Sequence, residues 1–260
     1  MKIHPTAIVD KKAKLADNVE VGPYAIIGPD VEIAGSTSVG AHVVIESHTS
    51  IGENCRIFTG AVIGSMPQDL KYRGEKSFLK IGNNNIIREY ATLNPGTEEG
   101  SVTSVGNGNL LMAYSHVAHD CKIGNGCVIA NSGTLAGHVT IEDKVVIGGL
   151  TAIHQFARVG KLAMIGGCSK VVQDIPPFST CDGHPSKVYG LNIIGLKRSG
   201  MSKDTLFALK QAFKILFYSR LIFKNAFEKV KEEIRDVEEV EYLLTFVKNS
   251  ERGVCKGGTE

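Results

Sequence analysis

Histidines gather in one part of this sequence. Of the eight histidines in the chain, four fall in the segments SHVAHDC, LAGHV and AIHQF, namely His116, His119, His138 and His154. Asp120 follows His119 directly, and Gln155 follows His154. A neutral imidazole near pH 7 is a good general base, an adjacent carboxylate fixes its tautomer, and clustered imidazoles also bind zinc. The segments therefore indicate proton transfer or metal binding, provided that the fold brings them together.

Aliphatic residues recur every six positions along most of the chain. The series is unbroken from Ile3 to Ile63, resumes from Ile81 to Leu93, and runs again from Val105 to Val171. An α-helix needs apolar residues at a period near 3.6 and a flat strand needs a period of two. A spacing of six fits a short strand and a corner repeated as one unit, and the β-branched anchors suit a pleated backbone. Glycine directly follows many anchors, as at Gly22, Gly40 and Gly106, where we expect the positive φ of a tight corner.

This pattern resembles the hexapeptide-repeat proteins, whose coils stack into a solenoid around one continuous core. The resemblance implies a mainly β fold, a left-handed parallel β-helix with about 18 residues in each three-sided coil, against the usual right-handed crossover. Residues one coil apart then stack. His119 would lie beneath Gly137 and Gln155, and Asp120 would lie beneath His138. Isolated histidines on such a face are usually solvated, but this cluster predicts a site.

Two polar segments leave the register, and we expect loops at residues 65–79 and 95–104. Loops on a rigid scaffold often collect binding groups, although tolerated insertions would look the same. From about Ser202 the apolar spacing becomes helical, with Ser202 and Asp204 as an N-terminal cap, and further helical stretches follow around residues 225–237 and 240–248. We therefore expect a β-helix over residues 1–190 and a small α-helical C-terminal domain over residues 191–260 that caps its open end.

Several motifs are more specific than the repeat itself. MPQDLKYRGE, AHD, NSGTLAGHV, HQF, QDIPPF and GLNIIGLKR, spread over nearly the whole chain, resemble the UDP-N-acetylglucosamine acyltransferases of lipid A synthesis. The resemblance implies transfer of a (3-hydroxy)acyl chain from acyl carrier protein to the 3-position of UDP-N-acetylglucosamine, the first step of lipid A biosynthesis. No metal and no cofactor is expected beyond the phosphopantetheine of the carrier.

The same resemblance assigns roles to residues. His119 would be the general base that activates the sugar hydroxyl, Asp120 would fix its tautomer, and the backbone N–H of Gly137 would stabilise the oxyanion. The remaining residues of the cleft would contact the sugar nucleotide or the acyl group: Gln68, Asp69, Lys71, His116, His138, His154, Gln155, Asn192 and Arg198. On their own, Lys71 and Arg198 would be taken for solvated basic residues.

Some residues depart from the family pattern, and one position is expected to set the length of the acyl chain. Asn94-Pro95, Ile194 and Ser199 differ from the usual residues, so the contacts to the nucleotide and the choice between a 3-hydroxyl and a 3-amino acceptor stay open. Gly167 lies at the family's ruler position and leaves space. Lys170, three coils beyond His116, would then stop an acyl chain of on the order of a dozen methylenes. The alternative is an ordinary exposed lysine.

The composition of the chain indicates which partners and which cellular compartment to expect. A net charge of +2 gives no reason to expect a nucleic-acid partner, and six cysteines without paired spacing fit a reducing compartment. No long apolar run indicates a transmembrane segment. We therefore expect a cytoplasmic protein, and the family resemblance implies a homotrimer that meets an acidic carrier protein through basic residues near the helical domain.

Three other functions remain open at this point. The related N-acyltransferase of the later pathway usually carries an extra N-terminal uridine-binding domain, whereas the repeats here begin at Ile3. A zinc-dependent, carbonic-anhydrase-like hexapeptide enzyme would use the clustered histidines as ligands. A non-enzymatic scaffold would use none of them.

Overall fold

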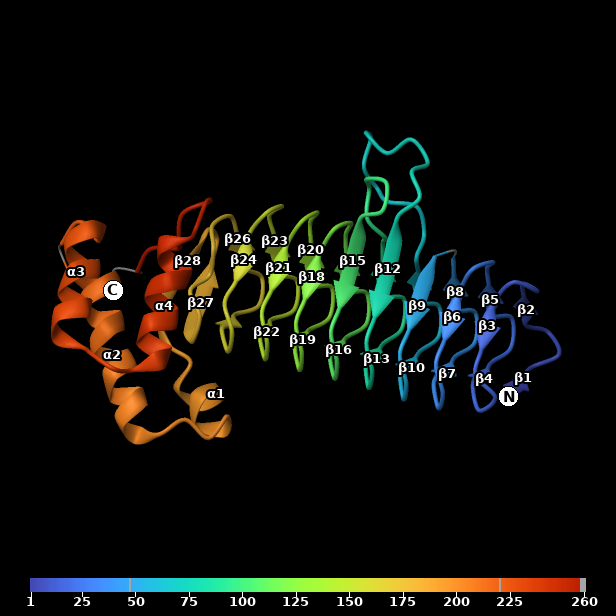
Figure 1. Cartoon of the computed structure of the whole chain (residues 1–260), viewed down its shortest axis with the longest axis horizontal. Helices are drawn as coiled ribbons and strands as arrows, with labels where there is room; N and C mark the ends of the chain where they lie inside the picture. Colours follow the sequence, from blue (N-terminus) through green and yellow to red (C-terminus); the bar gives the residue numbers. More distant parts are fainter. Residues whose placement is uncertain (47, 220, 258–260) are drawn as a thin grey trace.

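The computed structural model describes residues 1–46, 48–219 and 221–257, and it confirms the expected fold class. The chain forms a left-handed parallel β-helix of about 10 turns, followed by a small helical part at the C-terminal end of the prism (Figure 1). Short strands form three sheets that run the length of the prism.

Each complete coil contributes one parallel strand to each sheet, and the first sheet ends in an antiparallel hairpin. The first sheet contains β1 (Lys2–Ile3), β4 (Glu20–Val21), β7 (Ser38–Val39), β10 (Arg56–Ile57), β13 (Ile86–Ile87), β16 (Leu110–Leu111), β19 (Val128–Ile129), β22 (Val146–Ile147), β25 (Met164–Ile165), β27 (Ser179–Gly183) and β28 (Ser186–Leu191). The second contains β2 (Ile8–Val9), β5 (Ile26–Ile27), β8 (Val44–Ile45), β11 (Val62–Ile63), β14 (Thr92–Leu93), β17 (His116–Val117), β20 (Thr134–Leu135), β23 (Ala152–Ile153) and β26 (Lys170–Val171). The third contains β3 (Lys14–Leu15), β6 (Glu32–Ile33), β9 (Thr49–Ile51), β12 (Phe78–Ile81), β15 (Val102–Val105), β18 (Lys122–Ile123), β21 (Thr140–Ile141) and β24 (Arg158–Val159).

The core contains two inward-pointing columns per sheet. The anchors from Val21 to Val171 are buried, as the six-residue spacing predicted. A second column, two residues before each anchor, holds small buried side chains that the spacing alone did not reveal, among them Ala25, Cys55 and Cys121. Narrow corners thus accept small residues while the flat sides accept branched aliphatics, which keeps the interior close-packed.

The expected role of the glycines after the anchors is wrong at most positions. Positive φ falls two residues later, mostly on other residue types such as His42 (φ 56°) and Asn54 (φ 57°). Gly40 and Gly106 are needed because the next coil passes close by. A Cβ on Gly106 would lie 2.5 Å from the carbonyl oxygen of Gly124, and one on Gly40 would lie 2.9 Å from that of Ile57.

The two loops are shorter than expected. The first ends before Phe78 and the second before Val102, so they span residues 65–77 and 95–101. The remaining predicted loop residues belong to β12 and β15, which pair in parallel with Leu79 opposite Thr103. Both of these side chains are fully buried, and packing therefore draws the loop ends into the sheet. Figure 1 shows the loops projecting from the prism beside β12 and β15.

The helical part covers the C-terminal end of the solenoid. It contains α1 (Ile193–Arg198), α2 (Lys203–Tyr218), α3 (Phe223–Glu233) and α4 (Glu238–Lys248), and α3 begins and ends earlier than its apolar spacing predicted. Ser202 caps α2 by accepting a hydrogen bond from the backbone N–H of Thr205. Arg158 of β24 lies 4.4 Å from the ring centroid of Phe246 on α4. Among the described residues, no helix has both the length and the apolar character of a membrane span.

Candidate active site

The predicted stack of histidines is present. We call residues 118–121, 136–139 and 154–157, which turn from the second sheet into the third, the histidine corner. The backbone N–H of His138 donates to the carbonyl oxygen of His119, and that of Phe156 donates to the carbonyl oxygen of Gly137, at 3.0 and 3.1 Å. The His138 ring lies edge-on to His119 at 5.1 Å and stacks on Phe156 at 4.6 Å between centroids. The coil register therefore joins segments that are distant in sequence.

Gly137 leaves room for the imidazole of His119. A Cβ built on Gly137 would collide with the His119 ring, including its Nε2 atom. The ring therefore lies flat against the wall of the coil above, and its side chain is only 12% exposed. Within the described residues, the Gly137 N–H donates to no protein acceptor, so it stays available to a ligand.

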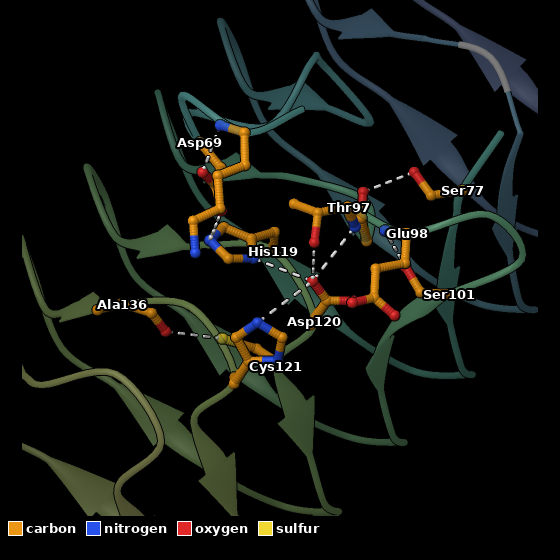
Figure 2. Close-up of polar contacts among 12 residues, drawn as sticks. Asp69, Ser77, Thr97, Glu98, Ser101, His119, Asp120, Cys121 and Ala136 are labelled. Carbon is orange, nitrogen blue, oxygen red and sulfur yellow. Dashed lines mark hydrogen bonds and ion pairs between the residues drawn. The ribbon is translucent and has the colours of Figure 1, made fainter. Parts of the chain in front are cut away.

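Asp120 orients His119. Its Oδ2 atom lies 3.0 Å from His119 Nδ1 (Figure 2). The same atom lies 3.8 Å from His138 Nε2. Burial pushes the pKa of Asp120 upward, but hydrogen bonds with His119, Thr97 and Ser101 and the nearby His138 outweigh burial and leave this pKa below its usual value. The ionised carboxylate accepts from Nδ1–H, and His119 then presents Nε2 as a proton acceptor.

The second loop supplies contacts that sequence reasoning missed. Thr97 donates to Asp120 Oδ2 through its hydroxyl at 2.7 Å and its backbone N–H at 3.2 Å. Just after the loop, Thr103 of β15 accepts from the Asp120 N–H at 2.7 Å. The signal in the sequence was the place where the six-residue repeat is interrupted. Ile86 pairs with Leu110, which is 24 residues later instead of the usual 18, so the coil beneath His119 contains extra residues.

The first loop reaches the same site, as predicted. Asp69 Oδ2 lies 3.8 Å from His119 Nε2, and Figure 2 shows Asp69 facing the imidazole from the side opposite Asp120. Gln68 and Lys71 flank Asp69 and are exposed. The Lys71 N–H donates to Asp69 Oδ1 at 2.8 Å, which holds the turn of the loop.

The other histidines of the cluster differ in burial. His116 is half-buried, with Nδ1 2.7 Å from the hydroxyl of Thr92. Burial, with a smaller effect of the neighbouring His119, lowers the pKa of His116, which favours its neutral form. His154 and Gln155 are exposed one coil above Gly137, and their side chains point to solvent in this single chain.

Asn192 and Arg198 do not reach the histidine corner of the same chain. Asn192 caps α1 by accepting from the Gly195 N–H at 3.0 Å, and it donates to the carbonyl oxygen of Leu162 at 2.9 Å. Leu162 belongs to the corner between the third and first sheets, which is a different edge of the prism. Arg198 ends α1 and is exposed. The expected single cleft would need a second chain to supply them.

The proposed acyl ruler follows the register of the second sheet. Lys170 pairs with Ala152, Ala152 with Thr134, and Thr134 with His116, so Lys170 lies three coils beyond His116. The outward side chains in between are small, and Lys170 itself is exposed. Gly167 lies at the next corner, beside the backbone of Gly149.

Three side chains come close to a metal-binding arrangement. Ligand atoms of His119, Asp120 and His138 lie within 4.8 Å of one another. The 3.8 Å between Asp120 Oδ2 and His138 Nε2 exceeds the roughly 3.3 Å expected of tetrahedral zinc ligands with bonds of about 2.0 Å. Oδ2 is also taken by donors from His119 and Thr97. Zinc would require the cluster to tighten and to give up these hydrogen bonds.

Comparison with known proteins adds sequence and structural relatives. Residues 174–255 match the family model of UDP-N-acetylglucosamine O-acyltransferase domain 2, and residues 103–137 match that of bacterial transferase hexapeptides. The chain is 51% identical over 256 residues to the acyl-[acyl-carrier-protein]–UDP-N-acetylglucosamine O-acyltransferase of Thermodesulfovibrio yellowstonii, which spans 98% of this chain and 99% of that protein. The Synechocystis protein of the same name is 53% identical over 180 residues, 69% of this chain and 65% of that one. The structure of the UDP-N-acetylglucosamine acyltransferase of Bacteroides fragilis matches with a TM-score of 0.96 at 42% identity, over 98% of this chain and 100% of that one.

Proposed function

The chain belongs to the UDP-N-acetylglucosamine O-acyltransferase family, and from this premise we propose that it moves a (3-hydroxy)acyl chain from acyl carrier protein to the 3-position of UDP-N-acetylglucosamine, at the start of lipid A biosynthesis. The observation that carries the proposal is the arrangement around His119. A partly buried imidazole is held by an ionised carboxylate, and it faces both a substrate loop and an unused backbone N–H.

In the proposed reaction, His119 acts as general base and then as general acid. Nε2 takes the proton of the sugar hydroxyl as its oxygen attacks the thioester carbonyl carbon. Asp120 stabilises the imidazolium that forms. When the tetrahedral intermediate collapses, the C–S bond breaks and the imidazolium returns the proton to the leaving thiolate. No acyl-enzyme is required, and the cofactor is the phosphopantetheine of the carrier.

Gly137 would stabilise the intermediate. Its N–H has no acceptor among the described residues and lies beside the His119 ring, where the carbonyl oxygen gains negative charge. Gln68, Asp69 and Lys71 of the first loop would close over the substrates.

The acyl chain would run along the second sheet from His116 toward Lys170. The small outward side chains of Thr134 and Ala152 leave a path, and three strand spacings of about 4.8 Å give roughly 14 Å, on the order of a dozen methylenes. Gly167 leaves space at the corner, so Lys170 would set the limit.

We further propose a cytoplasmic homotrimer. From β13 to β25 the outward residues of the first sheet are apolar, including the exposed Met164, and the second sheet exposes Ile26. The third sheet presents charged residues such as Lys14 and Glu32. Apolar faces of this kind mark interfaces. A neighbouring chain packed there would bring its Asn192 and Arg198 toward the histidine corner. Basic residues near α1 and α2, among them Lys197 and Lys203, would meet an acidic carrier.

The test is acyl transfer by the purified protein with carrier thioesters of graded length and with both 3-hydroxyl and 3-amino sugar nucleotides. His119→Ala should lower kcat by about 10²- to 10⁴-fold with an unchanged fold by circular dichroism. The exposed His42, in a different corner, serves as the control and should tolerate alanine. Turnover retained in His119→Ala would refute the base assignment, and zinc bound stoichiometrically to an enzyme inactive on every thioester would favour the carbonic-anhydrase-like alternative.

Lys170→Ala should lengthen the preferred acyl chain, and an unchanged chain-length preference would contradict the role of Lys170 as the ruler.

A further inference from the structure

The carboxylate that orients His119 is itself held by the second loop. Three donors converge on the single atom Asp120 Oδ2, namely His119 Nδ1 at 3.0 Å and the hydroxyl and N–H of Thr97 at 2.7 and 3.2 Å. Figure 2 shows Thr97 approaching this oxygen beside His119. Short, charge-assisted bonds of this kind are about twice as strong as neutral ones and fix the rotamer of the acceptor.

The second loop is braced, so it can transmit this constraint. The buried hydroxyl of Ser77 donates to the carbonyl oxygen of Gly96 at 2.6 Å. The Gly100 N–H donates to the carbonyl oxygen of Lys76 at 2.8 Å. The Lys76 N–H donates to the Glu99 carboxylate at 2.9 Å. The second loop is thereby joined to the end of the first loop, which carries Asp69.

Close approach of this loop to Asp120 depends on a glycine. A Cβ on Gly96 would collide with the hydroxyl of Ser101 and would lie 2.8 Å from Asp120 Oδ1. From the other side, the Asp120 N–H donates to Thr103. The side chain of Asp120 is left only 11% exposed, so water has little access to replace a lost donor.

We propose that Thr97 is a positioning residue for acyl transfer, because its two hydrogen bonds hold the Asp120 carboxylate where Oδ2 receives His119 Nδ1–H and Nε2 faces the acceptor hydroxyl. The inference rests on the proposed function. Thr97 touches neither substrate nor reacting atom and acts through Asp120. Without it, the carboxylate can rotate, and His119 loses its fixed tautomer and orientation.

The test compares three isosteric or near-isosteric variants in the acyl-transfer assay. Thr97→Val keeps the shape and removes the hydroxyl donor, and it should lower kcat about 10- to 100-fold with less than about a threefold change in KM for the sugar nucleotide. Thr97→Ser restores the donor and should recover kcat to within about threefold of wild type. Thr140→Val, the same chemical change on β21, should leave kcat unchanged.

A pH profile separates positioning from a merely structural role. The hydroxyl of Thr97 helps to lower the pKa of Asp120, so Thr97→Val should raise that pKa. This titration, followed by the carbon-13 chemical shift of the Asp120 carboxyl group, should move to higher pH in Thr97→Val but not in Thr97→Ser. A variant that lost only stability would show a lower melting temperature with an unmoved Asp120 titration, which would overturn the proposal.

A double-mutant cycle keeps the inference falsifiable if Thr97→Val is unstable. In an Asp120→Gly background, the further change Thr97→Val should cost less than about threefold in kcat, because the side chain that accepts from Thr97 is already gone. A full additive loss would contradict the proposal, as would a wild-type kcat in Thr97→Val. These failures differ from failure of the proposed function, in which the wild type lacks acyl transfer or His119→Ala retains it.

Discussion

Two corners of one coil share a backbone and differ in what they do. His119 and Asn125 each occupy the second position of a corner, followed by a residue with positive φ, Asp120 at 59° and Gly126 at 64°. We call the corner between the third and first sheets, at residues 82–85, 106–109, 124–127 and 142–145, the asparagine corner. Local backbone geometry therefore does not separate a site from a scaffold.

The asparagine corner uses its side chains to satisfy its own backbone. The side-chain oxygen of Asn125 accepts the N–H of Asn107 one coil below, and Asp143 accepts that of Asn125, at 2.8 and 2.7 Å. Inside, the amide of Asn109 donates to Asn85 and accepts from the Cys127 N–H. These hydrogen bonds between successive coils form a ladder, in which the buried and half-buried polar groups are paired, as stability requires.

The histidine corner leaves the equivalent groups open. Gly137 stands above His119 and has no side chain to accept the His119 N–H, and Gln155 stands above Gly137 with its side chain in solvent. Within the part of the chain that the structure describes, neither N–H has a protein acceptor. The comparison teaches that a solenoid wall becomes a site where the ladder is interrupted, because unpaired donors and an imidazole then face a ligand.

The largest expected effect comes from filling the gap in the histidine corner. Gly137→Ala would push a Cβ into the His119 ring and should lower kcat/KM by about 100-fold or more, with little change in melting temperature. Gly124→Ala is the control in the asparagine corner, where a Cβ would collide with the side chain of Asp143 and lie 2.9 Å from its backbone nitrogen. It should reduce stability and spare kcat/KM. Equal activity of the two variants would break the comparison.

The next effect concerns the ladder itself. Asn109 is 1% exposed, so Asn109→Ala leaves the Cys127 N–H without its acceptor and without water, and it removes one of the two donors to Asn85 Oδ1, which keeps the Asn109 backbone N–H. The free energy of unfolding should fall by about 1–3 kcal/mol in urea titrations. The kcat of the folded fraction should be unchanged, because Asn109 lies on a different edge from His119. Asn131→Ala, an exposed asparagine, should cost little, and a loss as large as that of Asn109→Ala would mean that burial is not the cause.

The sequence predicted the stacking of the histidine corner because the register is carried by large anchors in every coil. The position of a residue in the sequence then determines its position in the coil, and His119, Gly137 and Gln155 stack as expected. Thr97 escaped prediction because the loop that holds it has no register, and its partner Asp120 is found only in three dimensions. Asn192 lies at another edge of the same chain, beside Leu162, because a family motif does not say which chain supplies a residue to a shared cleft.

The smallest expected effect is a pH dependence of the free energy of unfolding, which we expect from the half-buried His116. Burial lowers the pKa of His116 in the folded chain, while the unfolded chain keeps a pKa near 6.5. The unfolded state therefore binds a proton first as the pH falls, and the contribution of neutral His116 to stability, present above pH 6.5, is lost as the pH falls toward its folded pKa. Unfolding measured between pH 7.5 and about pH 5 should show a shallower loss in His116→Asn, which keeps a polar partner for Thr92 but does not titrate, than in wild type. His42→Asn removes an exposed histidine and should leave the slope unchanged. An identical slope in all three proteins would mean that burial of His116 does not perturb its proton binding.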